Sequence, residues 1–288
     1  MNINIKTVQT GTGKHKHLSR VFYMLAYVGV IGSLGVVNLA HADNLYKTSF
    51  EQPTFLPGDQ LLGLDGWSTA TAIPPFLNPG AAFITNVAAK SGKQSVEVPG
   101  ANLVSAVEVT PYDAVAISRR PLNEGLGYDT ASGNKKIARV DADLMLKTPK
   151  PKTPGQFFSL TLSARAGDGS LGEIGLSSAG VVEAFAFDAP PGGVPLPNCK
   201  KTIRFNKWHH ITLLHNFANH ITSYFIDEHF LCSTPAPRLS TVLLRGSMGV
   251  FARPDGDPLT GPNSVRSDYT ARFDKFRISV HSEAPDLD

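Results

Sequence analysis

The sequence has few cysteines and little excess charge of either sign. Its 288 residues include two Cys, and 27 Lys and Arg stand against 24 Asp and Glu. Two cysteines are too few for a small fold held together by several disulfides. The near balance of charge argues against a nucleic-acid-binding protein, because contacts to phosphates need clustered Lys and Arg. We therefore expect no nucleic acid partner.

Several catalytic signatures are missing as well. The chain has no Gly-x-Ser-x-Gly and no phosphate-binding loop, and its two cysteines lack the Cys-x-x-Cys spacing. These absences argue against a serine hydrolase of the common type, a P-loop nucleotide-binding protein and a zinc site. Long amphipathic helical patterns are also lacking, which argues against an α/β fold.

The small positive charge belongs to the N-terminus. Residues 1–42 hold four basic residues and no acidic one, so 23 basic and 24 acidic residues remain in the rest. An apolar run, Val21 to Leu39, follows the basic stretch and precedes Ala40-His41-Ala42. This order is typical of a signal peptide with a small-x-small cleavage site. We predict a signal peptide over residues 1–42, cleavage after Ala42, a domain over residues 43–288, and a secreted, periplasmic or cell-surface location.

An uncleaved membrane anchor is the alternative interpretation of the same run. Nineteen residues that rise 1.5 Å each nearly cover a hydrocarbon layer of about 30 Å. Its glycines and its position before Ala-His-Ala favour cleavage. No second apolar run of membrane length follows in the sequence, so we expect no membrane span after cleavage.

The predicted export favours a disulfide between the two cysteines. Cys199 and Cys232 both follow the predicted cleavage site, and an oxidising compartment allows them a single pairing. We predict a disulfide between them, worth roughly 3 to 4 kcal/mol in the chain-entropy model. A pair of buried free thiols is the alternative.

The sequence pattern after residue 42 predicts β-structure throughout. Short stretches rich in Val, Ile, Phe and Thr alternate in polarity and are separated by Gly, Pro, Asn and Asp, the pattern of strands and turns. More than ten such stretches predict a sandwich or barrel. We expect surface loops at the proline-rich segments 147–154, 189–198 and 253–263. The predicted strands cover 47–51, 82–88, 94–98, 136–147, 157–165, 181–187, 202–205, 208–215, 221–226, 242–251 and 270–280.

An ordered set of short motifs resembles one superfamily. Ser49-Phe50-Glu51, Asp65-Gly66-Trp67, the Ser91-Gly92 turn, Trp208 with the Tyr224 hairpin, and the final strand around Asp274 follow one another in the chain. This order resembles the concanavalin A-like lectin/glucanase superfamily, the laminin-G-like jelly rolls of exported bacterial proteins. The resemblance implies an all-β, two-sheet antiparallel jelly-roll sandwich over nearly the whole mature chain. It departs from the family at Asp227-Glu228, where an Asp-Gly turn is usual, so we expect another turn type or length there.

The same resemblance implies a metal site. In many of these domains the first and last strands lie side by side and a carboxylate from each holds a structural calcium. Glu51 and Asp274 occupy the matching positions, and calcium prefers six to eight oxygen ligands. The alternative is that these carboxylates cap strand ends or pair with Arg272 or Lys275. The Asp255-Gly256-Asp257 loop lacks the order of an EF-hand, and we interpret it as a turn.

Five of the six mature histidines are concentrated between residues 209 and 229. Strand alternation places His209 and His215 on one face and His210 on the other. His215 and His220 would then face each other across a hairpin and could share a metal or a proton. Exposed or interface imidazoles on a β-hairpin are the alternative, since zinc sites normally need three or four ligands.

The residues of known enzymes on this fold are only partly present. The glucanase pattern Glu-x-Asp-x-x-Glu is missing, and its nearest substitute is the strand with Arg139, Asp141 and Asp143. We expect those acids to form a solvated outer face, with Arg139 offsetting their charge. Polysaccharide lyases of this fold use a Tyr base and cations that neutralise a uronate. Tyr224, His229 and Arg245 supply only the residue types.

We therefore favour a non-catalytic binding module with a polysaccharide or glycoconjugate as ligand, a step that depends on fold analogy. A polysaccharide-degrading enzyme, lyase or glycoside hydrolase, is the alternative. A structural or adhesion protein that binds another protein is the second. Aromatic faces stack on sugar rings, and the candidate contacts are Trp67, Tyr128 and Tyr269, each of which could instead be a packing residue.

Overall fold

A computed structural model describes most of residues 43–288, chiefly as β-strands. The described residues are 42–69, 82–99, 113–119, 127–148, 156–166, 169–186, 194–236, 240–254 and 269–284. Nearly all of the predicted signal peptide and the Asp255-Gly256-Asp257 loop lie outside them. None of the described residues belongs to a helix that is both long and apolar enough to cross a bilayer. The description below concerns the unit Ala40–Asp288.

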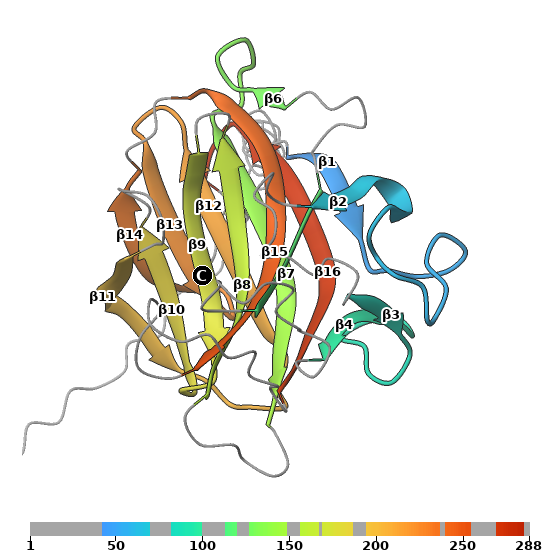
Figure 1. Ribbon diagram of the computed structural model, residues 1–288. Coiled ribbons are helices and arrows are strands. Elements are labelled where there is room, and N and C mark those ends of the chain that lie inside the picture. The colour runs from blue at the N-terminus through green and yellow to red at the C-terminus, as the bar shows by residue number, and fades with distance from the viewer. Residues whose placement is uncertain are drawn as a thin grey trace, which may run out of the picture. The chain divides into compact units, whose positions relative to one another are not determined.

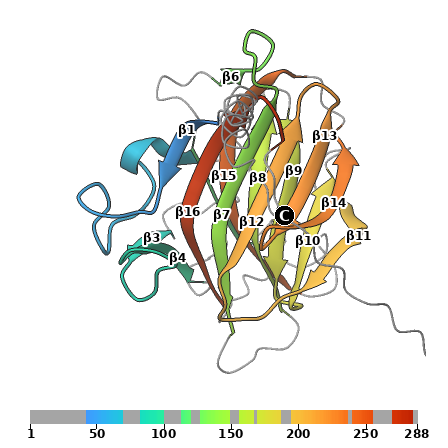
Figure 2. The same ribbon diagram turned by 180° about the vertical axis from the view of Figure 1, so that it is seen from behind.

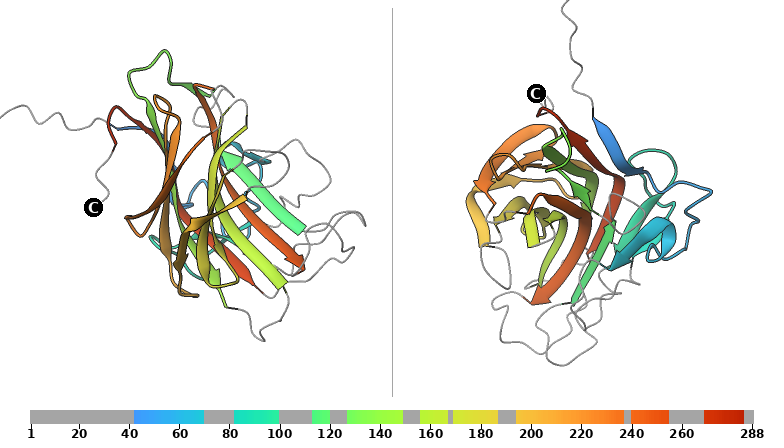
Figure 3. Two further views of the ribbon diagram at one scale, coloured as in Figure 1. Left: turned by 90° about the vertical axis from the view of Figure 1, so that its left-hand side faces the viewer. Right: turned by 90° about the horizontal axis from the view of Figure 1, so that it is seen from above.

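The strands form two antiparallel sheets that pack as the two layers of a sandwich (Figures 1 and 3). This confirms the predicted all-β jelly-roll sandwich. The first sheet, here called sheet A, has the order β14-β13-β12-β7-β16-β4-β3, with β1 paired to β16. It faces the viewer in Figure 2. Its strands are β1 (Asp43–Thr48), β3 (Phe83–Thr85), β4 (Ser95–Pro99), β7 (Ile137–Lys147), β12 (His209–Asn216), β13 (Ile221–Ile226), β14 (His229–Pro235) and β16 (Thr270–His281).

The second sheet, sheet B, has the order β11-β10-β9-β8-β15-β5-β2, with β6 paired to β15. A one-turn 3-10 helix, η2 (Leu64–Gly66), precedes β2. Sheet B consists of β2 (Trp67–Thr69), β5 (Asp113–Arg119), β6 (Tyr128–Asp129), β8 (Gln156–Ala166), β9 (Gly169–Ser177), β10 (Val181–Ala186), β11 (Val194–Thr202) and β15 (Val242–Pro254).

The core lies between the sheets and follows from the period of two. On β7, Val140, Ala142 and Leu144 are fully buried in the core, while the odd-numbered residues 139, 141 and 143 point to the outer face. Burying each aliphatic side chain contributes about 1.5 to 3 kcal/mol. Gly246 of β15 is required where the sheets approach, because a Cβ there would lie 2.8 Å from Val140 and 2.9 Å from Phe276.

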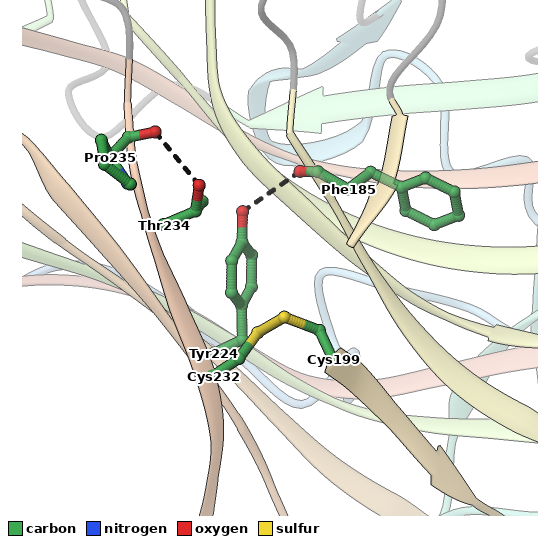
Figure 4. Close-up of a disulfide and its surroundings, with 6 residues drawn as sticks. All are labelled: Phe185, Cys199, Tyr224, Cys232, Thr234 and Pro235. Atoms are coloured by element: carbon green, nitrogen blue, oxygen red, sulfur yellow. Dashed lines mark hydrogen bonds between the residues drawn. A yellow bond between two sulfur atoms is a disulfide. The ribbon is translucent and has the colours of Figure 1, made fainter. Parts of the chain in front are cut away.

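A disulfide and a hydrogen bond join the two sheets near the edge at which β11 and β14 are the outermost strands (Figure 4). Cys199 of β11 and Cys232 of β14 form a disulfide with a Cα–Cα distance of 5.4 Å, which confirms the predicted pairing. The hydroxyl of Tyr224 on β13 donates a hydrogen bond to the carbonyl of Phe185 on β10, at 3.2 Å. Gly172 leaves room for that hydroxyl, since a Cβ there would lie 2.5 Å from it.

The structure differs from the predicted strands and loops in several places. Strands β2, β5, β6, β9 and β14 have no counterpart among the predicted strands. The expected loop 189–198 is wrong in its second half, because Val194 begins strand β11. Pro195 and Pro197 are tolerated there because an edge strand does not need every N–H. The strand expected at 202–205 is correspondingly displaced, and only Thr202 belongs to β11.

The turn between β13 and β14 has two residues despite lacking glycine. Asp227 and Glu228 both adopt positive φ, 51° and 69°, as a two-residue hairpin turn of type I′ requires. The Asp227 carboxylate accepts hydrogen bonds from the backbone N–H of His210 at 2.9 Å and from His209 Nδ1 at 2.9 Å. These bonds offset the cost of the left-handed backbone, so the expectation of another turn type or length was wrong.

Candidate functional site

The outer face of sheet B has unusually small side chains at its centre. On β8, β9 and β15 the core residues alternate with residues that point outward. Five of these outward positions are serine or glycine, and we call them the sheet B floor: Ser163, Gly175, Ser177, Ser247 and Gly249. Ser247 pairs with Ser163 across β15 and β8, and Gly249 and Gly175 pair with the same residue of β8 from its two sides. Ser177 lies two residues after Gly175 on β9. An outer face of this kind can accept a flat ligand close to the backbone.

Two hydroxyl groups of the floor lack partners. Ser177 is 2% exposed and Ser247 is 4% exposed, and neither Oγ has a hydrogen-bond partner among the residues that the structure describes. A buried polar group without a hydrogen bond costs roughly 1 to 3 kcal/mol. A ligand rich in hydroxyl groups would satisfy both oxygens, which makes the floor a candidate binding surface.

Two arginines lie side by side at one end of the floor. Arg165 of β8 and Arg245 of β15 are direct cross-strand partners, a pairing that brings Cβ atoms to about 4.5–5.5 Å. Burial lowers the pKa of Arg165, an effect that the nearby Glu173 opposes. Like charges placed opposite each other destabilise a sheet unless an anion lies between or beside them. Glu173 lies near Arg165, and two guanidinium groups side by side can in addition bind a carboxylate of a ligand.

A second carboxylate lies on the next strand. Glu183 of β10 is the cross-strand partner of Gly175, so it is diagonal to Glu173, which lies two residues earlier on β9. Glu183 forms an ion pair with Lys200 at 2.9 Å. Both glutamates of this face therefore lie next to cations.

The outer face of sheet A carries a charge network instead. Asp141 accepts hydrogen bonds from Arg139 Nε at 2.8 Å and from Arg277 Nε and Nη2 at 3.0 Å each. Asp143 is 3.0 Å from His210 Nδ1. The two aspartates face outward as predicted, but each is only 2% exposed, so the expectation of a solvated face was wrong. The longer side chains of their partners cover them, and the network is already satisfied within the chain.

The two predicted calcium ligands lie at one loop. Glu51 Oε1 accepts hydrogen bonds from the backbone N–H groups of Lys93 and Gln94, at 2.8 and 3.0 Å. Asp274 Oδ2 accepts those of Lys90 and Ser91, at 2.7 and 2.9 Å. Burial raises the pKa of Asp274, although the hydrogen bonds to its carboxylate oppose that shift.

The first and last strands pair, as the resemblance implies, and Glu51 and Asp274 each accept hydrogen bonds from the segment 90–94. As they lie, however, N–H donors rather than oxygens surround the two carboxylates, and this does not fit a calcium cage. Nor do the described ranges contain three His, Cys, Asp or Glu side chains arranged around a common metal position. Structural calcium stays a prediction.

The three aromatic candidates for ligand contact lie largely in the interior. Trp67 is 1% exposed, packs edge-on against Phe276 and donates a hydrogen bond from Nε1 to Tyr46. Tyr269 is 4% exposed and packs near Phe205. Tyr128 of β6 is half-buried against the core. The structure gives these side chains packing contacts, and their role in ligand binding remains untested.

The histidines follow the predicted alternation. His209 and His215 are 4% and 0% exposed, and His210 lies on the opposite, outer face. The rings of His215 and His220 come within 6.5 Å between centroids. Burial, aided by the neighbouring His220, lowers the pKa of His215 to about 4. His215 is thus a neutral core residue at pH 7.

The three residues that supply the residue types of a lyase site, Tyr224, His229 and Arg245, do not lie together in the structure. Tyr224 is fully buried between the sheets and His229 is exposed on β14, both in sheet A. Arg245 belongs to sheet B, on the sheet B floor side. Sequence reasoning missed Arg165, Glu173 and the floor because their proximity depends on cross-strand register. Small outward residues between apolar inward ones were the only local signal.

No family model matches the chain, and no curated protein matches it. Among solved structures it is similar to an endo-β-1,4-glucuronan lyase from the fungus Trichoderma reesei, with 10% identity, a TM-score of 0.49, and coverage of 84% of this chain and 100% of the other. It is similar to the family 7 alginate lyase A1-II′, with 10% identity, a TM-score of 0.46, and coverage of 70% and 83%. It is also similar to the CBM2 module of the evolved Dit of Lactobacillus casei BL23 phage J-1, with 11% identity and a TM-score of 0.49. The match covers 85% of this chain and 99% of the other. These likenesses concern the arrangement of the strands.

Proposed function

We propose that this protein cleaves a uronate-bearing polysaccharide that lies across the sheet B floor. The observation that carries the proposal is the cluster of Arg165, Arg245 and Glu173 beside a floor with two hydroxyl groups that have no hydrogen-bond partner among the described residues. In this proposal the two arginines bind the uronate carboxylate, because a guanidinium group matches a carboxylate in geometry and charge. The serine hydroxyls of the floor bind sugar hydroxyls.

Glu173 would act as the base of an elimination. The acidic proton of a uronate is on C5, next to the carboxylate, so a base beside the carboxylate-binding arginines is close to that proton. Glu173 takes the C5 proton, the C4–O bond breaks as a C4–C5 double bond forms, and the leaving oxygen takes a proton from water. The arginines stabilise the negative charge that develops on the carboxylate. General base catalysis typically contributes 10² to 10⁴ in rate.

The charges favour elimination over hydrolysis. Hydrolysis by two carboxyl groups needs one of them protonated as a general acid. Glu183 is paired with Lys200 at 2.9 Å, and Glu173 lies next to Arg165. Each glutamate therefore has a cation beside it, which differs from the apolar surroundings of a carboxyl group that acts as a general acid.

Binding without cleavage is the second candidate, and it was the one that the sequence favoured. Its support is that no tyrosine or histidine is found among the described outward side chains of β8, β9, β10 and β15. The leaving oxygen would then have only solvent as its proton source. In this version the same floor, arginines and carboxylates hold the polysaccharide as a non-catalytic module.

A polysaccharide array with product analysis tests both candidates. Alginate, pectate and glucuronan are each incubated with the protein, and unsaturated ends are followed by ultraviolet absorbance while affinity electrophoresis measures binding. We expect wild type to bind and to form unsaturated ends. Glu173→Gln should bind but lose at least 100-fold in rate, and Arg245→Ala should lose binding as well.

Glu283→Gln is the matched control, because Glu283 is an exposed glutamate after β16, and it should behave as wild type. Binding without any product from wild type would establish the second candidate. Absence of binding to all three uronate polysaccharides would overturn the proposal.

Export belongs to the same proposal. A polysaccharide is an extracellular or cell-envelope substrate, which agrees with the signal peptide predicted over residues 1–42. The mass of the protein recovered outside the cytoplasm tests this step. A mature N-terminus at Asp43 would support cleavage after Ala42, and an intact Met1 would support the anchor.

A further inference from the structure

The outer face of sheet A has an exposed aromatic pair at its edge. Phe230 of β14 is 59% exposed, and its ring lies 5.6 Å from that of Phe225 on β13, with an interplanar angle of 69°. The two residues are cross-strand partners at the hairpin, on the side of sheet A where β13 and β14 lie in Figure 2. Phe230 is the most exposed aromatic side chain among the described residues. A large aromatic side chain left in water at this position suggests a contact surface.

An unused hydroxyl lies beside the aromatic pair. Thr212 of β12 is the cross-strand partner of Phe225, so its side chain lies on the same outer face. It is 1% exposed, and within the described part of the chain its Oγ1 makes no hydrogen bond. His210, two residues earlier on the same face, keeps a quarter of its side chain exposed. The surface thus combines an aromatic ring with polar groups at its rim.

We propose that Phe230, Phe225, Thr212 and His210 form a second glycan-binding surface, in which one sugar ring stacks on Phe230 and its hydroxyl groups bind Thr212 and His210. We call it the sheet A platform. The glycan assignment rests on the proposed function, since the ligand is the same class of polysaccharide. A pyranose ring has an apolar C–H face and hydroxyl groups at its rim, which matches this arrangement. The buried Oγ1 of Thr212 gains the hydrogen bond that it lacks.

A sugar fits the platform better than a second copy of the chain. Stable protein interfaces bury at least about 1,000 Å² in total and have an apolar centre. The platform is bounded on its inner side by the charged row of Arg139, Asp141 and Arg277, so its apolar part is confined to the edge hairpin. One or two sugar rings would cover that area.

The platform and the sheet B floor lie on opposite outer faces of the sandwich. A chain held on the platform therefore leaves the floor free, so the platform keeps the protein on a polymer while another chain is processed. This predicts that the platform contributes to binding of long chains and not to turnover of short ones.

Affinity electrophoresis in gels that contain alginate or pectate tests the platform, with turnover of a tetrasaccharide measured in parallel. We expect Phe230→Ala to raise the dissociation constant for the polymer about tenfold, which corresponds to about 1.4 kcal/mol. Thr212→Val should raise it several-fold without lowering the melting temperature, because its hydroxyl has no hydrogen bond to lose. Neither variant should change the rate on the tetrasaccharide.

Ile221→Ala is the matched control, because Ile221 is an apolar residue of β13 that is 37% exposed and lies outside the platform. It should migrate as wild type. Wild-type migration of Phe230→Ala would overturn the platform even if the floor binds. A dimer in gel filtration that Phe230→Ala converts to monomer would also overturn it, because a second copy would then be the occupant. Loss of tetrasaccharide turnover in Glu173→Gln alone tests the floor separately.

Discussion

The disulfide between β11 and β14 gives the most direct test of what holds the sandwich closed. Cys199 and Cys232 are 33 residues apart and join an edge strand of sheet B to an edge strand of sheet A. Replacing both by serine, or reducing the bond, frees that loop in the unfolded chain. The chain-entropy model gives a loss of about 4 kcal/mol for a loop of this length. Their Cα–Cα distance of 5.4 Å lies within the usual range for disulfides.

Urea denaturation with and without reductant measures the effect. We expect the free energy of unfolding to fall by about 4 kcal/mol. In a thermal melt of a domain of this size, that loss lowers the melting temperature by roughly 8 to 16 °C. Because the effect is on the unfolded state, the double variant Cys199→Ser with Cys232→Ser and the reduced wild type should lose similar stability, and the reduced wild type should regain it on oxidation. A loss below about 1 kcal/mol, with a thiol assay showing full reduction, would refute the reasoning. The hydrogen bond of Tyr224 to Phe185 would then be the main tie at this edge.

Three further predictions concern other parts of the fold. Gly172→Ala should destabilise the protein by about 1 to 3 kcal/mol, because the new Cβ would lie 2.5 Å from the Tyr224 hydroxyl; Tyr224→Phe should relieve part of that loss in a double-mutant cycle measured in urea. Stability should fall as the pH drops from about 6.5 to about 4, because unfolded His215 binds a proton in that range while burial and a neighbouring histidine lower the pKa of the folded residue to about 4. This single group contributes about 3 kcal/mol over that range, so His215→Gln should flatten the pH profile, and an unchanged slope would contradict the assignment. At Glu51 and Asp274, a melting temperature that is unchanged by chelator and lowered by Asp274→Asn would favour the backbone hydrogen bonds seen here; a calcium-dependent rise that Glu51→Ala abolishes would favour the ion.

The sequence predicted those features that depend on local alternation. The apolar residues at 140, 142 and 144 of β7 identified both the strand and its inner face, and the structure confirms them. The pairing of Cys199 with Cys232 could be predicted because export leaves two thiols a single partner. The resemblance placed Glu51 near Asp274 because it supplied the adjacency of the first and last strands, which no local pattern contains.

Features that depend on register or on tertiary contacts could not be predicted. The turn at Asp227 keeps two residues without glycine because His209 and His210 hydrogen-bond its carboxylate, and that contact exists only when β12 and β13 are paired. Strand β11 was hidden by its prolines, which an edge strand tolerates. Aspartates 141 and 143 were expected to be solvated, because a single strand does not show which long side chains of its neighbours will cover it.

The candidate site on sheet B also depends on strand register, so the sequence did not predict it. Arg165 and Arg245 are 80 residues apart, and only the register of β8 with β15 makes them neighbours. The glucanase pattern places its acids on one strand, whereas Glu173, Arg165 and Arg245, the residues of the proposed site, come from three different strands. The sheet B floor matches no sequence motif, because its common feature is the absence of large side chains at outward positions of several strands. The strongest indication of a ligand is accordingly a physical one. On a face where arginines and glutamates meet, the hydroxyl groups of Ser177 and Ser247 have no hydrogen-bond partner in the described part of the chain.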